Sequence, residues 1–244
     1  MELVIHTVGA LLSIKDCQFI IPGFSSELAL KTFEGFFEMN EIYGLYNKNK
    51  ISINHKNVRL NQVNIESEKD IEEYILSIRD NLKNIVLVNF AACSIDGLSS
   101  RYSSKDWDTT FNINVKSNFI FSKYLSPIMI ANKWGRIINI SSVRSLNGAV
   151  GASAYSSSKS ALIGLNRSIA KENARFGVTS NILNLGYFDS GLFRKFTPER
   201  KAKYLNEVPS KKLGSYKDIY SAIHFLISSD YTNGSVITID GCME

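Results

Sequence analysis

The chain has few of the residues that hold disulfide-rich or metal-dependent proteins together. Its three cysteines, Cys17, Cys93 and Cys242, are far apart and odd in number, and they form neither a CxxC pair nor a metal-ligand spacing. This pattern indicates free thiols in a reducing compartment. The three histidines are isolated from one another, so no metal site is predicted.

Long apolar runs and a basic leader are also missing. No apolar stretch approaches the roughly 20 residues that a membrane-spanning helix needs. The N-terminus, MELVIHTVGALLSIKD, carries Glu2 where a signal peptide would be basic. The net charge is +5, but the basic residues are scattered and lack the aromatic-basic interleaving of nucleic-acid modules. We therefore expect a cytoplasmic protein that binds neither membranes nor nucleic acids.

The chain does contain short apolar, β-branched runs that alternate with longer amphipathic stretches. The runs that predict strands are residues 17–22, 42–46, 85–89, 136–141, 179–184 and 235–239. The stretches that predict helices are residues 25–39, 106–129, 152–176 and 218–228. Between the second strand and Val63 the segment is polar, so the crossover helix expected there is short or missing.

Continuous apolar strands are typical of a parallel sheet that helices cover on both faces. The alternation thus predicts a single-domain α/β fold that is doubly wound and Rossmann-like, with a mostly parallel sheet. We expect seven strands and a ligand site beyond their carboxyl ends. The domain covers residues 13–244 and follows an N-terminal extension of residues 1–12.

Two residues of the run AYSSSK, Tyr155 and Lys159, are spaced for acid–base chemistry. On a helix this spacing places both side chains on one face, one turn apart. A neighbouring ammonium favours the phenolate, which suits a proton donor and acceptor in carbonyl–alcohol interconversion. The spacing alone is weak, because Tyr46 and Lys50 repeat it in a polar stretch without other support.

Two further polar residues stand at the same end of the predicted sheet. Ser142 closes the strand-forming run GRIINISS, and Asn114 is an amide inside a long predicted helix. An amide at such a position disfavours a helix and needs a hydrogen-bonding partner.

From about residue 13 to its end, the chain resembles the short-chain dehydrogenase/reductase family. The similar runs are VLVNFAA, SSKDWDTTFNINV, GRIINISSV, AYSSSKSALIGLNRSIAKE, NILNLG, VPSKKLG and ITIDG. The resemblance implies that Tyr155 is the acid–base residue, and that Lys159 lowers its pKa and holds the nicotinamide ribose. Ser142 would polarise the substrate carbonyl, and Asn114 would hold a water linked to Lys159.

The glycine-rich loop of that family is degraded here. The family has TGxxxGxG after its first strand, whereas residues 22–29 read PGFSSELA. Glu27 brings a carboxylate to the helix start where a pyrophosphate would rest, and Ala29 adds a Cβ where helix and sheet close together. The resemblance nevertheless assigns cofactor contacts to Gly23, Ser25, Lys48, Asn64, Asn89, Ala91, Tyr155, Lys159, Gly186 and Ser190.

Three functions remain open at this point. The first is an oxidoreductase that interconverts a carbonyl and a secondary alcohol with NAD(P)(H), and whose dinucleotide affinity is weakened. The second is redox-independent dehydration or isomerisation at the same residues. The third is a catalytically silent partner subunit that binds no dinucleotide.

NADP(H) is favoured over NAD(H), because no acidic residue ends the second strand while Lys48 and Lys50 could meet a 2′-phosphate. Two solvated loop lysines explain the same pattern equally well. We expect a small-molecule carbonyl or alcohol as substrate, and its identity is not readable from the sequence. An apolar body is suggested by Phe188, Leu192, Phe193 and Phe196. Arg194, Lys195 and Arg200 could receive an anionic or carrier-linked group. The resemblance also implies a homodimer or homotetramer in which helices 106–129 and 152–176 pair across a two-fold axis.

Overall fold

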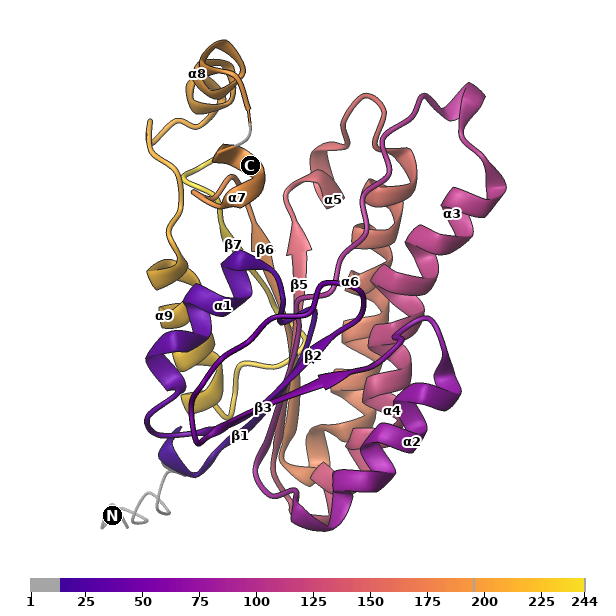
Figure 1. Ribbon diagram of the computed structural model, residues 1–244, viewed down its shortest axis with the longest axis vertical. Helices are drawn as coiled ribbons and strands as arrows, with labels where there is room; N and C mark the ends of the chain where they lie inside the picture. Colours follow the sequence, from indigo (N-terminus) through magenta and orange to yellow (C-terminus); the bar gives the residue numbers. More distant parts are fainter. Residues whose placement is uncertain (1–13, 195, 244) are drawn as a thin grey trace, which may run out of the picture.

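The computed structural model describes residues 14–194 and 196–243. They form one seven-stranded sheet with the order β3-β2-β1-β4-β5-β6-β7, and every strand pairing is parallel (Figure 1). The strands are β1 (Gln18–Pro22), β2 (Glu41–Tyr46), β3 (Val58–Gln62), β4 (Ile85–Asn89), β5 (Gly135–Ser142), β6 (Val178–Leu185) and β7 (Val236–Ile239). The predicted doubly wound, Rossmann-like fold is confirmed.

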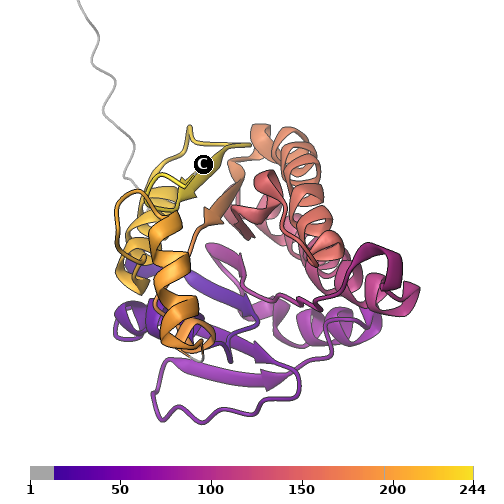
Figure 2. The ribbon, with the colours of Figure 1, turned by 90° about the horizontal axis from the view of Figure 1, so that it is seen from above.

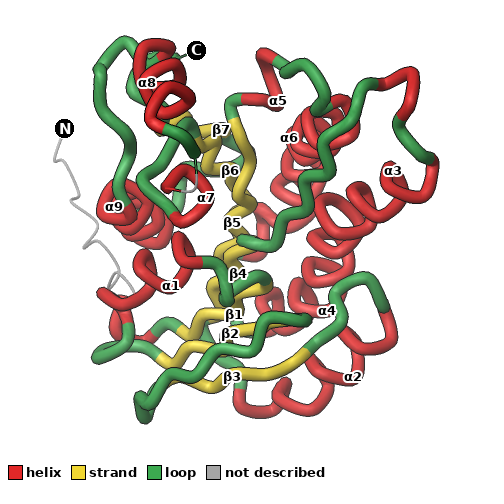
Figure 3. The backbone as a smooth tube through the Cα atoms, turned by 45° about the horizontal axis from the view of Figure 1, so that its top comes forward, coloured by secondary structure: helices red, strands yellow, loops and turns green. Residues whose placement is uncertain are grey.

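Helices cover both faces of the sheet. The α-helices of the described residues are α1 (Glu27–Phe33), α2 (Glu68–Ile78), α3 (Ser104–Phe111), α4 (Ser117–Ala131), α5 (Arg144–Asn147), α6 (Ser153–Asn173), α7 (Gly191–Arg194), α8 (Pro198–Glu207) and α9 (Tyr216–Ser228). Helices α2, α4 and α6 lie on one face, and α1 and α9 lie on the other (Figure 3). Within the described residues no helix is long and apolar enough to cross a membrane.

The two-sided covering explains why the strands read as unbroken apolar runs. In β1, Phe19 and Ile21 belong to the core cluster under α1 and α9, whereas Ile20 belongs to the cluster under α2 and α4. Successive side chains of a strand point to opposite faces, so a sheet buried on both sides needs apolar residues at every position.

The crossover between β2 and β3 differs from the others, as the sequence predicts. Residues 47–57 connect the two strands without a helix. The first helix is also shorter than residues 25–39, because α1 begins at Glu27 and is followed by a 3₁₀ turn at Glu34–Phe36. The predicted N-terminal extension, residues 1–12, lies outside the described residues.

Strands β1 and β4 are neighbours at the centre of the sheet, and the strand order reverses between them. In open α/β sheets ligands bind beyond the carboxyl ends of the strands at such a switch point. Helices α7 and α8 stand above these ends on one side and α5 stands on the other, as seen from the side and from above (Figures 1 and 2).

Candidate functional site

Two cavities adjoin each other at the carboxyl ends of the strands. The first, of about 540 Å³, lies between the segments that follow β1, β2, β3 and β4. The second, of about 380 Å³, lies over β5 and β6 and beneath α7 and α8. Three residues, Ser26, Phe90 and Ala92, line both cavities, so the two form one bipartite site. We refer to them as the first cavity and the catalytic cavity.

Three of the four residues predicted to be catalytic line the catalytic cavity. Ser142 is the last residue of β5, and Tyr155 and Lys159 lie one turn apart on α6. Ser142 and Tyr155 line the same cavity, and the Ser142 side chain is close enough to lower the pKa of the Tyr155 phenol in part, so the two hydroxyls converge. The backbone N–H of Arg144 also donates to Ser142 Oγ, at 3.3 Å.

Asn114 is close to this group but lines neither cavity. Its amide is fully buried in a π-helical segment, Asn112–Lys116, that separates α3 from α4. Oδ1 accepts from the N–H of Cys93 at 2.7 Å, and Nδ2 donates to the carbonyl of Cys93 and to Ser158 Oγ, both at 2.9 Å. Asn114 therefore ties the segment after β4 to α6, and the water expected beside it remains a prediction.

The surroundings of Tyr155 raise the pKa of its phenol, mainly because burial disfavours the charged form. The hydrogen bond from Ser142 and the charge of Arg144 lower it in part. The resemblance implies that Lys159 lowers this pKa as well, and that role remains a prediction.

Lys159 is 1% exposed, and its Nζ donates to the carbonyl of Ile140 at 2.8 Å. The same Nζ lies 5.9 Å from the centroid of the Tyr155 ring. Burial lowers the pKa of this ammonium to about 8, because water no longer solvates its charge.

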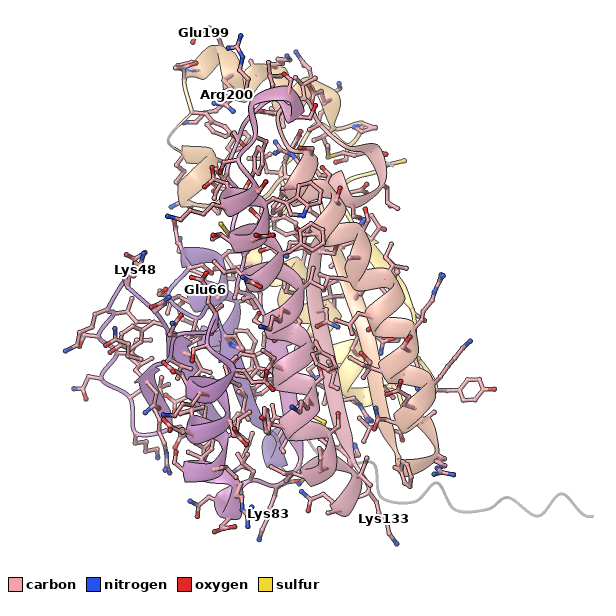
Figure 4. All side chains as sticks on the ribbon, turned by 90° about the vertical axis from the view of Figure 1, so that its right-hand side faces the viewer. Lys48, Glu66, Lys83, Lys133, Glu199 and Arg200 are labelled. Atoms are coloured by element: carbon pink, nitrogen blue, oxygen red, sulfur yellow. The ribbon has the colours of Figure 1, made fainter. Side chains whose placement is uncertain are left out.

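Four of the residues expected to hold a cofactor line the first cavity: Gly23, Ser25, Lys48 and Ala91. Gly23 has φ +82°, and a Cβ there would lie 2.4 Å from the backbone nitrogen of Ala91. Only glycine therefore fits where the end of β1 meets the segment after β4. Lys48 reaches this cavity from the loop after β2 and Glu66 reaches it from the segment after β3 (Figure 4).

Gly186 and Ser190 line the catalytic cavity, together with Tyr155 and Lys159. Asn64 and Asn89 line neither cavity, and their assignment as cofactor contacts remains a prediction. Asn89 is fully buried and its Nδ2 donates to Asn139 Oδ1 at 2.8 Å, across the β4–β5 pair. Asn64 instead accepts a hydrogen bond from the N–H of Glu66 at 3.2 Å.

The residues that replace the family's glycines do not fill the first cavity. Ala29, which replaces one of them, and Phe24, which follows Gly23, are fully buried in the core beneath α1. Glu27 lines neither cavity, and its carboxylate lies 2.7 Å from Arg194 and 3.1 Å from Lys31. The retained backbone approach at Gly23 and the cationic partners of Glu27 make this cavity compatible with a phosphate-bearing ligand.

Aromatic side chains form the outer wall of the catalytic cavity. They are Tyr187, Phe188, Phe193, Phe196 and Tyr204. Arg200 stacks on Phe196, 4.0 Å from the ring centroid, and is exposed on α8 (Figure 4). Lys195, another expected contact for an anionic group, lies outside the described residues.

Sequence reasoning missed several residues of the site, among them Phe90, Arg144, Tyr187 and Tyr204. Phe90 lies at the junction of the two cavities. Arg144 was not considered, although its place two residues after Ser142 could have drawn attention to it. In residues 14–194 and 196–243, no group of histidine, cysteine or acidic residues could hold a metal ion.

Comparisons with known proteins show the family of the chain. The family model for short chain dehydrogenases matches residues 44–201. The 3-oxoacyl-(acyl-carrier-protein) reductase FabG of Aquifex aeolicus is 33% identical over 197 residues, which cover 80% of this chain and 79% of that protein. The protein of the same name from Buchnera aphidicola is 37% identical over 160 residues, and the match spans 65% of each chain.

A solved structure has the same fold. The crystal structure assigned as a gluconate dehydrogenase of Agrobacterium tumefaciens matches with a TM-score of 0.84, over 93% of this chain and 95% of that chain. At 24% sequence identity, this likeness concerns the fold alone.

Proposed function

The chain belongs to the short-chain dehydrogenase family of oxidoreductases, and on this premise we propose that it interconverts a carbonyl and a secondary alcohol with a nicotinamide dinucleotide. The observation that carries the proposal is the convergence of the Ser142 and Tyr155 hydroxyls on a cavity that adjoins a second, phosphate-compatible one. A dinucleotide needs two neighbouring compartments of this kind, one for each nucleotide.

In this proposal Tyr155 is the group that moves the proton. Its raised pKa keeps the phenol protonated at neutral pH, which suits a proton donor to a carbonyl oxygen during reduction. Ser142 would donate a hydrogen bond to the same oxygen and orient it. Lys159, held by the carbonyl of Ile140, places a positive charge beneath the Tyr155 ring.

The cofactor would occupy both cavities. Gly23 and Ser25 would approach its phosphates, Lys48 would face the adenine-side ribose, and Gly186 and Ser190 would contact the nicotinamide end. When bound, the nicotinamide supplies or accepts the hydride. We propose NADP(H) rather than NAD(H), because Lys48 lines the first cavity and can pair with a 2′-phosphate.

The test combines cofactor binding with turnover. Calorimetry should detect binding of NADPH, and a panel of ketones and oxo acids should include substrates that consume it. Tyr155→Phe should lower the rate at least about a hundredfold, the lower range for loss of a general acid. Tyr231→Phe is the matched control, because Tyr231 is fully exposed.

Two results would contradict the proposal. Failure to bind either dinucleotide at millimolar concentration would remove the oxidoreductase assignment. A Tyr155→Phe variant as fast as the wild type, with an unchanged melting temperature, would remove Tyr155 from the reaction.

We also propose that the chain forms a homo-oligomer through α4 and α6. Phe119 on α4 is 49% exposed, although it is a large apolar residue. An exposed aromatic residue of this kind is a natural contact in an interface between copies. Light scattering should show a dimer or tetramer, and Phe119→Asp should shift the population towards monomer.

A further inference from the structure

Among the described residues, the catalytic cavity has a positive charge that no acidic residue balances. Two cations, Arg144 and Lys159, line it, and none of its described lining residues is an aspartate or a glutamate. Lys159 donates to a backbone carbonyl and lies beneath Tyr155. Arg144 is therefore the other cation that the described lining contributes.

Arg144 differs from the other arginines of the chain. Seven of them are exposed, and Arg136, which is 1% exposed, pairs with Asp230. Arg144 is half-buried, yet among the described residues no carboxylate lies within ion-pair distance of its guanidinium. No hydrogen bond from that guanidinium to another described group is found either. A half-buried guanidinium without a partner loses part of its solvation without compensation.

The position of Arg144 places this charge beside the reacting hydroxyls. Its backbone N–H donates to Ser142 Oγ at 3.3 Å. Burial raises the pKa of both Tyr155 and Tyr187, and the charge of Arg144 lowers each of them in part, so the guanidinium lies near both rings. Arg144 does not line the first cavity, and the phosphates of a cofactor bound there would leave it free.

We infer that Arg144 forms an anion subsite in the catalytic cavity, and that the substrate is a carboxylate-bearing carbonyl or hydroxyl compound. A guanidinium presents paired N–H donors that match the two oxygens of a carboxylate. The aromatic wall formed by Tyr187, Phe188, Phe193, Phe196 and Tyr204 would receive an apolar or aromatic body. The assignment of the carbonyl as the reacting group rests on the proposed function.

The first test measures binding without turnover. Phenylacetate and phenylacetamide have nearly the same shape and differ in charge, and both can be titrated by calorimetry. The wild type should bind the carboxylate at least about tenfold more tightly, which corresponds to about 1.4 kcal/mol. Arg144→Gln should reduce this preference to less than about twofold, and Arg144→Lys should keep part of it because the charge remains.

A matched control separates the subsite from the general charge of the protein. Arg101 also has no ion pair with a described residue, but it is exposed and lines neither cavity, so Arg101→Gln should keep the wild-type preference. Equal binding of the acid and the amide would overturn the inference. An unchanged preference in Arg144→Gln, or no binding of either compound at millimolar concentration, would overturn it too.

The second test uses turnover and separates this inference from the proposed function. Phenylpyruvate and its methyl ester should be compared with NADPH as the reductant. Faster turnover of the acid, lost in Arg144→Gln mainly through KM, supports the subsite. Turnover of acid and ester at equal efficiency would overturn the subsite alone. A carboxylate preference in binding without any dinucleotide binding would overturn the proposed function alone.

Discussion

The carboxylate of Glu27, at the start of α1, lies 2.7 Å from Nη1 of Arg194 at the end of α7. Arg194 also donates to Asp189, and Lys31 lies 3.1 Å from Glu27. Two cations and two carboxylates thus balance each other in this exposed cluster. The contact joins the loop after β1 to the segment above the catalytic cavity, and it offsets the negative charge that Glu27 brings to the helix start.

This pairing limits how much Glu27 can weaken cofactor binding. We predict that Glu27→Gln raises the affinity for NADPH by about two- to fivefold, because one charge at a helix terminus contributes about 0.3–1 kcal/mol. Calorimetric titration of NADPH measures the change. Glu34→Gln, at the other end of the same helix, is the control and should have no effect. A loss of affinity for NADPH would show that the ion pair between Glu27 and Arg194 favours cofactor binding instead.

Restoring the last glycine of the loop should not improve binding. The side chain of Ala29 is fully buried in the core and lines neither cavity. We expect Ala29→Gly to lower the free energy of unfolding by about 1 kcal/mol, through its effect on helix propensity. Its dissociation constant for NADPH should equal that of the wild type. Tighter binding in this variant would mean that the buried methyl group holds the helix away from the phosphates.

Cofactor preference should depend on Lys48 and not on Lys50. Lys48 lines the first cavity, whereas Lys50 does not. Lys48→Ala should therefore lower the ratio of NADPH to NADH affinity by about fivefold to tenfold, the effect of about 1–1.4 kcal/mol from one phosphate contact. Lys50→Ala should leave the ratio unchanged. An equal loss of affinity for both cofactors in Lys48→Ala would contradict a 2′-phosphate contact.

The burial of Lys159 predicts a pH dependence of stability. Burial lowers its pKa from 10.5 to about 8. Between about pH 8 and 10.5 the unfolded chain therefore binds more protons at this site, and the free energy of unfolding rises with pH. Below about pH 8 both states are protonated, and the cost of burying the charge is fully present.

Denaturant titrations of wild type and Lys159→Met at several pH values measure this contribution. The stability advantage of the variant should shrink from pH 8 to 10.5 by on the order of 3 kcal/mol, at about 1.4 kcal/mol per pKa unit. The comparison removes the opposing effect of the buried tyrosines, whose raised pKa values lower stability at alkaline pH. Lys171→Met, on the exposed side of α6, should follow the wild type. If the difference in unfolding free energy between wild type and Lys159→Met did not change with pH, the Lys159 ammonium would be solvated by water and not buried.

The last prediction concerns the packing of the altered loop. A Cβ at Gly44 in β2 would lie 2.1 Å from Cδ1 of Phe24, whose ring is fully buried. Gly44→Ala should lower the free energy of unfolding by about 1–3 kcal/mol, as overpacked cores do. Gly164→Ala, on α6 with no atom within 4 Å of its added Cβ, is the control and should stabilise slightly. Equal stability of the two variants would mean that the Phe24 ring can move aside.

The sequence by itself determined the fold and the residues proposed to be catalytic. Unbroken apolar strands require helices on both faces of the sheet, and right-handed crossovers then place the strand ends together. Tyr155 and Lys159 follow the period of a helix, so local periodicity puts these two on one face, and Ser142 ends a strand at the same edge of the sheet. The resemblance to a known family supplied the roles of these residues.

Only the tertiary structure decided where side chains turn once they reach the site. Asn89 ends β4 as expected, but the β4–β5 register pairs its amide with Asn139 inside the sheet. Glu27 meets Arg194, 167 positions away, and Arg144 meets no carboxylate at all among the described residues. Burial and partners at long range set charge compensation and pKa, and neither is encoded in the spacing of neighbouring residues.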